Sequence, residues 1–222
     1  MPSQKDAVII EPETAASASV IWLHGLGADG HDFEPIVPEL RLPADPGVRF
    51  IFPHAPVRAV TINAGMQMRA WYDVRHMDLR MQEDADSIND SAKIASDYID
   101  TEIANGIPAD NIILAGFSQG GAIALHAGLR YPEKLAGLLV LSAYLPLPEL
   151  LASEGSDANR TVSIMMAHGI YDPVIPVDAG KQSCEFLHQH GYPTTWVTYP
   201  MQHAVCLEEI QDIANWLKSC LA

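Results

Sequence analysis

The feature that most constrains the fold is an apolar run that ends in a serine between glycines and continues as a helical pattern. Residues 112–117 are largely apolar, Ser118 follows them, and Gly120 and Gly121 come soon after. We interpret this stretch as a buried strand, a tight turn and a helix, because glycines on both sides of the serine let the strand and the helix pass closely. A serine in this Gly-x-Ser-x-Gly setting is typical of a nucleophile elbow, so Ser118 is the candidate nucleophile.

Short β-type runs alternate with helical patterns along the rest of the chain. We predict strands at residues 7–10, 19–23, 49–52, 112–117, 137–141, 161–167 and 194–198. We predict the clearest helices at residues 83–105, 177–189 and 205–221. Apolar strands that alternate with helices indicate an α/β fold, with a mostly parallel central sheet covered by helices on both faces. In such folds the functional residues lie on loops at the carboxyl ends of the strands.

Length and composition fit a single domain over residues 1–222. A chain of this length buries about 70 % of its extended-chain surface, and no apolar run approaches the roughly 20 residues of a spanning helix. The net charge is −15. Because nucleic acids and anionic membrane surfaces are themselves negative, we expect neither nucleic-acid binding nor stable membrane binding.

The cysteines and the start of the chain favour a reducing compartment. Cys184, Cys206 and Cys220 are odd in number and lack a C-x-x-C spacing, so we expect reduced thiols. The first 20 residues contain no basic start followed by a long apolar core. We therefore expect no secretory signal and a cytoplasmic location.

Two longer segments, residues 53–82 and 142–159, interrupt the alternation and carry many apolar side chains. Loops of this length are commonly functional, so we predict that residues 53–82 form a lid or substrate-binding insertion. The alternative is that both segments only cover an edge of the sheet. The candidate contacts for an apolar substrate are Leu26, Met66, Met68, Trp71, Tyr144, Leu145 and Val174.

A serine nucleophile needs a base and a group that orients the base. The acidic candidates after Ser118 include Asp157, Asp172 and Asp178, and the histidines after Asp172 are His188, His190 and His203. Asp172 follows the predicted strand 161–167, whereas Asp178 begins a helix, where capping is its expected role. His203 follows the strand 194–198 at the same edge, whereas His188 and His190 fall near the far end of a helix. We therefore predict the catalytic triad Ser118, Asp172 and His203.

Acyl transfer also needs hydrogen-bond donors where an oxyanion forms. The elbow supplies the Gln119 amide, and the glycine-rich turn at residues 24–30 makes the Leu26 amide the natural second donor. This turn lacks both the Walker ending and the G-x-G-x-x-G pattern of phosphate-binding loops. No Cys/His pairing or H-E-x-x-H motif indicates a metal, so we expect no metal and no cofactor. We assign no catalytic role to His24, His54, His76 or His168.

The chain resembles the bacterial carboxylesterase and acyl-protein thioesterase family of α/β-hydrolases, also called the phospholipase/carboxylesterase family. The resemblance spans nearly the whole chain and lies in the motifs at residues 24–30, 53–56, 71–73, 116–121, 145–146 and 168–174 and in His203. It implies hydrolysis of carboxylic esters and acyl thioesters by the predicted triad, with Leu26 and Gln119 as oxyanion hole and a short lid.

The resemblance leaves the substrate and the partners open. The substrate would be an acyl ester or thioester, which includes an acylated protein or a lysophospholipid, and a homodimer is a further option. A lysophospholipase or a short-chain esterase would use the same triad, and a non-catalytic ligand receptor could use the same fold. Tyr72 and Tyr144 stand where relatives often carry Phe and Trp, and a phenol hydroxyl there would shorten or wet an acyl pocket.

Overall fold

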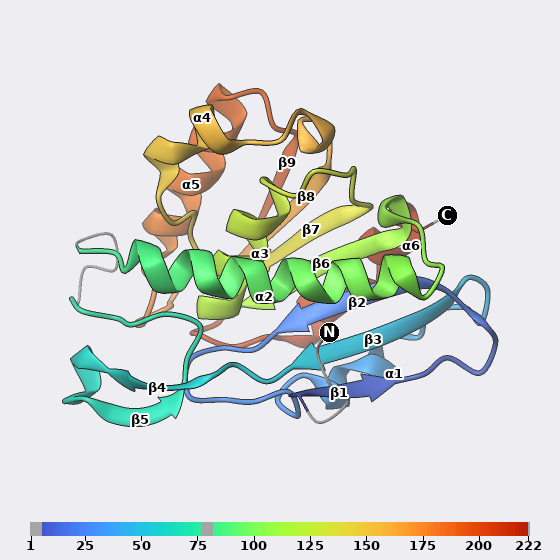
Figure 1. Ribbon diagram of the computed structural model, residues 1–222, viewed down its shortest axis with the longest axis horizontal. Helices are drawn as coiled ribbons and strands as arrows, with labels where there is room; N and C mark the ends of the chain where they lie inside the picture. The colour runs from blue at the N-terminus through green and yellow to red at the C-terminus, as the bar shows by residue number, and fades with distance from the viewer. Residues whose placement is uncertain (1–5, 77–81, 222) are drawn as a thin grey trace.

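The computed structural model describes residues 6–76 and 82–221, and its centre is a sheet of seven strands (Figure 1). The strands are β1 (Ala7–Ile10), β2 (Ala16–Leu23), β3 (Gly47–Pro53), β6 (Ile112–Phe117), β7 (Gly137–Leu141), β8 (Ser163–Gly169) and β9 (Thr194–Tyr199). Their order across the sheet is β1-β3-β2-β6-β7-β8-β9. β1 pairs antiparallel with β3, and every other neighbouring pair is parallel. The predicted mostly parallel sheet is confirmed.

Helices cover both faces of this sheet (Figure 1). On one face, α2 (Ala85–Ala104), α3 (Gln119–Gly128) and α5 (Val177–Gln189) share a hydrophobic cluster with strand side chains. On the other face, α1 (Val37–Leu40) and α6 (Leu207–Cys220) contribute to a second cluster. Along β6, Leu114 belongs to the first cluster, and Ile113 and Ala115 belong to the second. This alternation is expected of a strand that is buried on both faces.

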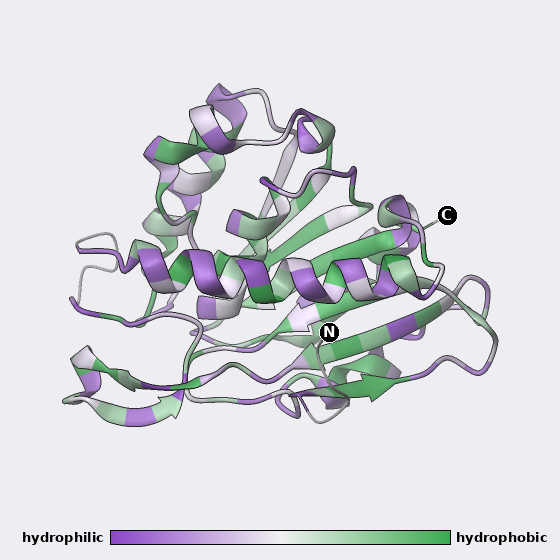
Figure 2. Ribbon diagram, viewed as in Figure 1, coloured by the Kyte–Doolittle hydropathy of each residue, from purple (hydrophilic) through white to green (hydrophobic). Residues whose placement is uncertain are grey.

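The α2 helix shows how its apolar period determines its packing. Ile88, Ala95 and Ile99 recur at helical spacing and are fully buried, while hydrophilic bands recur along the same helix in Figure 2. The helix ends at Ala104, and Gly106 follows with a φ of 96°. Glycine adopts this left-handed conformation without steric cost, so the chain can turn back toward β6.

The order of the strands creates a crevice at one edge of the sheet. From β2 the chain moves to β3 on one side, whereas β6 lies on the other side of β2 and the later strands follow outward from it. Loops that leave neighbouring strands in opposite directions separate at the carboxyl ends. The loop after β2 begins at His24, and the turn after β6 holds Ser118. Both segments therefore border the same crevice.

The segment at residues 53–82 contains an antiparallel hairpin that the sequence pattern does not predict. β4 (Val57–Val60) pairs with β5 (Met66–Arg69), and a 3₁₀ turn at Thr61–Asn63 lies between them. Figure 1 shows this hairpin beyond the carboxyl end of β3. Residues 77–81 of the segment lie outside the described residues.

The other long segment and several element boundaries also differ from the sequence interpretation; β2, for example, begins at Ala16 rather than at residue 19. Residues 142–159 include α4 (Leu151–Glu154) and two 3₁₀ turns, at Pro148–Leu150 and Asp157–Asn159. β8 lies slightly further along the chain than the predicted strand 161–167, because its last residues still pair with β9. α6 begins at Leu207, after its N-cap residue Cys206, rather than at residue 205.

Candidate active site

Ser118 lies at the turn between β6 and α3, in a backbone conformation that few side chains adopt. Its φ is 55° and its ψ is −122°, and its amide donates to the Leu141 carbonyl at 2.8 Å. A Cβ on Gly116 would lie 2.3 Å from the Gly120 backbone, and a Cβ on Gly120 would lie 2.3 Å from the Leu23 carbonyl oxygen. The close approach of strand and helix thus holds Ser118 in a strained turn, and such strain is common at functional sites.

His203 connects Ser118 to Asp172. The Ser118 hydroxyl donates to His203 Nε2 at 2.9 Å, and His203 Nδ1 donates to Asp172 Oδ2 at 2.6 Å. Asp172 follows β8 and His203 follows β9, at the edge where Ser118 follows β6. The Phe117 ring lies 4.7 Å from the His203 ring between centroids, so an apolar contact also holds the imidazole. The structure therefore brings the three predicted triad residues into one hydrogen-bonded chain.

Asp172 is surrounded by hydrogen-bond donors. The amides of Val174 and Ile175 donate to its Oδ1 at 2.8 and 2.9 Å, and His168 Nε2 lies 3.4 Å from its Oδ2. Burial alone would raise the pKa of Asp172, but hydrogen bonds from His168, His203 and the two amides outweigh burial and hold this pKa well below its usual range. Asp172 is therefore ionised near neutral pH, which keeps a proton on His203 Nδ1 and leaves Nε2 free to accept one.

A cavity of about 310 Å³ opens beside Ser118. Its walls come from the loop after β2, the hairpin segment, the elbow and the loop after β8. The lining residues are Leu26, Ile62, Asn63, Tyr72, Val74, Ser118, Gln119, Pro173, Val174 and Ile175. Most of these side chains are apolar, so the cavity suits a hydrocarbon chain placed next to a hydroxyl nucleophile.

The predicted substrate contacts fall into two groups. Leu26 and Val174 line the cavity, and Met68 lies close by, where its Sδ accepts a hydrogen bond from Asn63 at 3.3 Å. Met66 is 63 % exposed on the hairpin. Leu26, Met68 and Val174 thus lie at or near the cavity, and contact of a substrate with any of the four residues stays a prediction.

Trp71, Tyr144 and Leu145 form the second group: all three are buried, and none of them lines the cavity. Their exposed fractions are 0, 1 and 2 %. The Tyr144 hydroxyl lies 3.2 Å from the hydroxyl of Tyr72, which is the member of the pair that lines the cavity. The phenol expected near an acyl pocket is therefore that of Tyr72, with Tyr144 behind it.

Five lining residues were not singled out from the sequence, and one of them, Val74, lies in the segment after β5. Pro173 and Ile175 flank Val174 next to Asp172, so their position in the chain was a usable signal. Ile62 and Asn63 reach the cavity only because the hairpin folds toward it. Nothing in the sequence pattern had indicated that hairpin.

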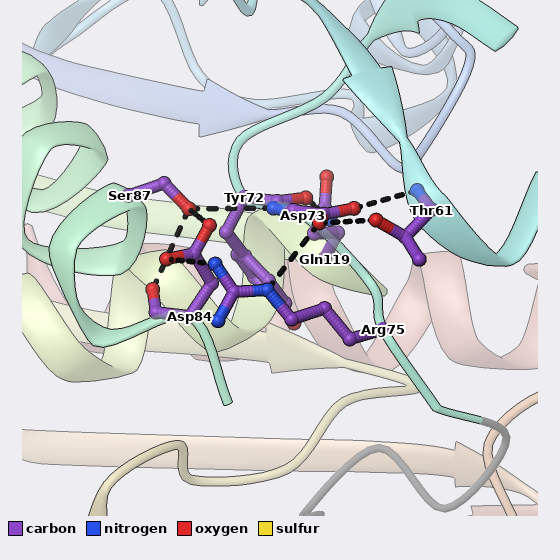
Figure 3. A network of polar contacts seen from close by, with 7 residues as sticks. All are labelled: Thr61, Tyr72, Asp73, Arg75, Asp84, Ser87 and Gln119. Atoms are coloured by element: carbon purple, nitrogen blue, oxygen red, sulfur yellow. Dashed lines mark hydrogen bonds and ion pairs between the residues drawn. The ribbon is translucent and has the colours of Figure 1, made fainter. Parts of the chain in front are cut away.

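A polar network holds the hairpin end of the cavity wall against α2 (Figure 3). Asp73 accepts hydrogen bonds from the amide and the hydroxyl of Thr61, at 2.7 and 2.6 Å. Arg75 contacts Asp84 at 3.0 Å and Asp73 at 3.4 Å, and the Asp73 amide donates to the Ser87 hydroxyl at 3.3 Å. The lining residues next to Thr61 and Asp73 are fixed in place by these contacts.

The two residues predicted to supply the oxyanion donors also border the cavity beside Ser118. Leu26 and Gln119 both line it. Gln119 is the first residue of α3, so its amide has no acceptor inside the helix. Among residues 6–76 and 82–221, no backbone carbonyl accepts a hydrogen bond from the Leu26 amide. That these two N–H groups bind an oxyanion formed at Ser118 stays a prediction.

Two further kinds of feature are absent from residues 6–76 and 82–221. There, no group of three or more His, Cys, Asp or Glu side chains could hold a metal ion. The thiols of Cys184, Cys206 and Cys220 are free. None of the described helices combines the length and the apolar character needed to cross a membrane.

A serine on the turn after a central parallel strand, joined to a histidine and an aspartate from loops after later strands, defines the α/β-hydrolase class. This chain is an α/β-hydrolase by that criterion. The sequence model of the phospholipase/carboxylesterase family matches residues 4–221, so the chain belongs to that family. The family predicted from the sequence motifs is thereby confirmed.

Individual relatives agree with this assignment. The chain is 38 % identical over 231 residues to acyl-protein thioesterase 1 of Gibberella zeae, and the alignment covers 100 % of this chain and 98 % of that protein. It is 39 % identical over 224 residues to acyl-protein thioesterase 1 of Neurospora crassa, covering 97 % of this chain and 91 % of that protein. Arabidopsis thaliana SOBER1 has a similar structure, with a TM-score of 0.87 and 32 % identity over 92 % of this chain and 99 % of that one.

Proposed function

We propose that this chain is a serine hydrolase that cleaves carboxylic esters and acyl thioesters through an acyl-serine intermediate. The observation that carries the proposal is the hydrogen-bonded chain from Ser118 through His203 to Asp172, with distances of 2.9 and 2.6 Å, beside an apolar cavity. Membership of the phospholipase/carboxylesterase family and similarity to acyl-protein thioesterases support the same reaction.

In the acylation step, Ser118 Oγ attacks the substrate carbonyl carbon while His203 Nε2 takes the hydroxyl proton. Asp172 stabilises the imidazolium through Nδ1, and the amides of Leu26 and Gln119 bind the oxyanion. The tetrahedral intermediate collapses, and the alcohol or thiol leaves with the proton from His203. Water then attacks the acyl-serine with His203 again as base, and the carboxylic acid is released.

The substrate is proposed to carry an apolar acyl group that enters the cavity between Leu26, Tyr72 and Val174. An acylated protein is one source of such a group, as the names of the relatives suggest, and a lysophospholipid is another. Contact of the acyl group with Met66 and Met68, and assembly into a homodimer, remain part of this proposal. A lysophospholipase and a short-chain esterase differ from it only in substrate preference.

The test is hydrolysis of p-nitrophenyl esters with acyl chains from about 2 to 16 carbons, alongside matched acyl thioesters, which span the size range of an apolar pocket. We expect activity in the wild type and a loss of at least about 10³-fold in kcat for Ser118→Ala. Ser219→Ala, an exposed position on α6, is the matched control and should keep wild-type activity.

A non-catalytic receptor on the same fold is the alternative from a different class. Titration with a serine-reactive phosphonate separates the two. Stoichiometric labelling that Ser118→Ala abolishes supports the hydrolase, because it requires an activated hydroxyl at that position. A folded wild type that neither labels nor hydrolyses any substrate would overturn the proposed function in favour of the receptor.

A further inference from the structure

Trp71 is completely buried, yet its polar groups make three hydrogen bonds to three different parts of the site. Its indole Nε1 donates to the His24 carbonyl at 2.9 Å, and its amide donates to the Gln119 side chain at 2.7 Å. Its carbonyl accepts a hydrogen bond from the Ser91 hydroxyl on α2. One residue thus connects the loop after β2, the nucleophile elbow and a helix that covers the sheet.

The Gln119 side chain completes a two-point contact with the same segment. Its Oε1 accepts from the Trp71 amide at 2.7 Å, and its Nε2 donates to the Tyr72 carbonyl at 2.7 Å. The partners fix the orientation of the side chain, because a backbone N–H can only donate and a carbonyl can only accept. Gln119 is 4 % exposed, so these bonds are sheltered from water. The segment after β5 is therefore fastened to the first residue of α3.

The loop that carries Leu26 is fastened to this segment on both sides of Leu26. Before it, the His24 carbonyl accepts from the Trp71 indole; after it, the Gly27 amide donates to the Arg69 carbonyl at 2.9 Å. The His24 ring also lies 5.3 Å from the Trp71 ring between centroids. The segment at residues 69–72 thus contacts both loops that supply a proposed oxyanion donor.

We propose that Trp71 and the side chain of Gln119 are positioning residues that fix the distance between the Leu26 and Gln119 amides. The two donors come from loops after different strands, and residues 69–72 are the common support of both loops. The inference rests on the proposed function, since it concerns the oxyanion hole of that reaction. It assigns Trp71, which the sequence placed against the substrate, a role behind the cavity wall.

These support bonds matter for the rate because they preorganise the two amide donors. Amide donors stabilise an oxyanion strongly only if they are already in place when the charge develops. A displacement of about 1 Å can cost roughly 100-fold in rate. Loss of a support bond should therefore lower kcat more than it raises KM, because the ground-state carbonyl depends less on these donors than the oxyanion does.

The chain offers a matched pair of substitutions for the test. Trp71→Phe removes the indole N–H that binds the His24 carbonyl and keeps most of the buried ring. Trp216→Phe removes an indole N–H that donates to the Ser163 hydroxyl at 3.1 Å, on α6 and away from the cavity. We expect a fall of about tenfold or more in kcat for Trp71→Phe with KM changed by less than about threefold, and no such fall for Trp216→Phe.

A trifluoromethyl ketone provides the second readout, because its adduct with a serine hydroxyl carries the same oxyanion. Its inhibition constant should rise in parallel with the loss of kcat, while phosphonate labelling of Ser118 still reaches completion. Gln119→Met removes the two hydrogen bonds of the Gln119 side chain to residues 71 and 72 and keeps a side chain of similar size. It tests the same positioning role if Trp71→Phe does not fold.

The possible outcomes distinguish the positioning role from the proposed hydrolase function. An active wild type whose Trp71→Phe and Gln119→Met variants keep kcat and inhibitor affinity within about twofold overturns the positioning role and leaves the hydrolase proposal intact. A rise in KM alone also overturns it, because that result indicates a binding role. A wild type without hydrolase activity overturns both.

Discussion

At the scale of single residues, the hydrogen bonds that Asp172 accepts determine which ring nitrogen of His203 carries the proton. Both carboxylate oxygens of Asp172 already accept hydrogen bonds, Oδ1 from two backbone amides and Oδ2 from His203. An asparagine there has only one oxygen. Because the two amides require an acceptor, the NH₂ group of the asparagine would turn toward His203 and favour the tautomer with its proton on Nε2. That tautomer cannot accept the Ser118 proton.

Asp172→Asn should therefore lower kcat by about 10³- to 10⁴-fold while the protein stays folded. Steady-state ester hydrolysis measures the loss, and circular dichroism checks the fold. Asp178→Asn is the control, because Asp178 is exposed at the start of α5 and was the alternative acid in the sequence. A kcat for Asp172→Asn within tenfold of the wild type would show that Asp172 does not orient the base.

The sequence could place Ser118, Asp172 and His203 at one edge because each follows a strand, and parallel strands end on the same side. The sequence could not show which of Trp71, Tyr72 and Tyr144 lines the cavity and which is buried behind another residue. Trp71 is hidden by the loops that it supports, and which loops those are depends on contacts with His24 and Gln119, far away in the chain. Such contacts leave no local pattern.

At the scale of elements, α3 approaches β2 so closely that Gly120 is a structural requirement. A Cβ on Gly120 would meet the Leu23 and His24 carbonyl oxygens at 2.3 and 2.5 Å, and these backbone atoms belong to the central sheet and its loop. A Cβ on Gly128, in the same helix, would meet the end of the Leu138 side chain at 2.2 Å. A side chain can change rotamer, whereas the strand backbone cannot move without its sheet.

Gly120→Ala should thus destabilise the fold strongly, by about 4 kcal/mol or more, even though alanine favours helices. Gly128→Ala should cost about 1–3 kcal/mol, the usual range for an overpacked side-chain site. Urea unfolding followed by fluorescence gives both values. Equal losses for the two variants would contradict the distinction between backbone and side-chain contacts.

The β4–β5 hairpin is the element that the sequence pattern does not predict. Its loop has Ala64 and Gly65 at φ values of 56° and 73°. Two consecutive residues with positive φ in a hairpin turn are usually Asn-Gly or Gly-Gly. Because alanine stands in the first position here, the sequence lacks this hairpin signal. By contrast, α2 and the central strands carry strong periodic or apolar patterns, and their bounds lie close to those predicted. Local pattern thus sufficed for the sheet and its helices but not for the cavity rim.

At the scale of the whole molecule, the net charge of −15 makes the protonation of buried acids important for stability. Glu209 on α6 has an exposed fraction of 0 %, and neither carboxyl oxygen has a hydrogen-bond partner of good geometry among the described residues. Burial raises the pKa of Glu209 from 4.5 to about 8, the Cys206 amide opposes this rise, and Asp212 adds to it. The folded protein therefore holds this proton at neutral pH, whereas the unfolded chain releases it.

This difference gives stability a definite dependence on pH. Between pH 4.5 and about 8 the folded state binds one proton more than the unfolded state at Glu209, so this residue makes the free energy of unfolding fall as the pH rises. Glu209→Gln removes the titration and keeps a similar shape. We expect its Tm to be close to that of the wild type at pH 5 and several degrees higher at pH 9, measured by calorimetry across that range.

Glu208→Gln, an exposed neighbour with the same change of charge, is the control and should follow the wild-type profile. Parallel Tm profiles for wild type and Glu209→Gln would mean that the Glu209 carboxyl titrates alike in the folded and unfolded chain, and that the charged form is solvated in the folded protein.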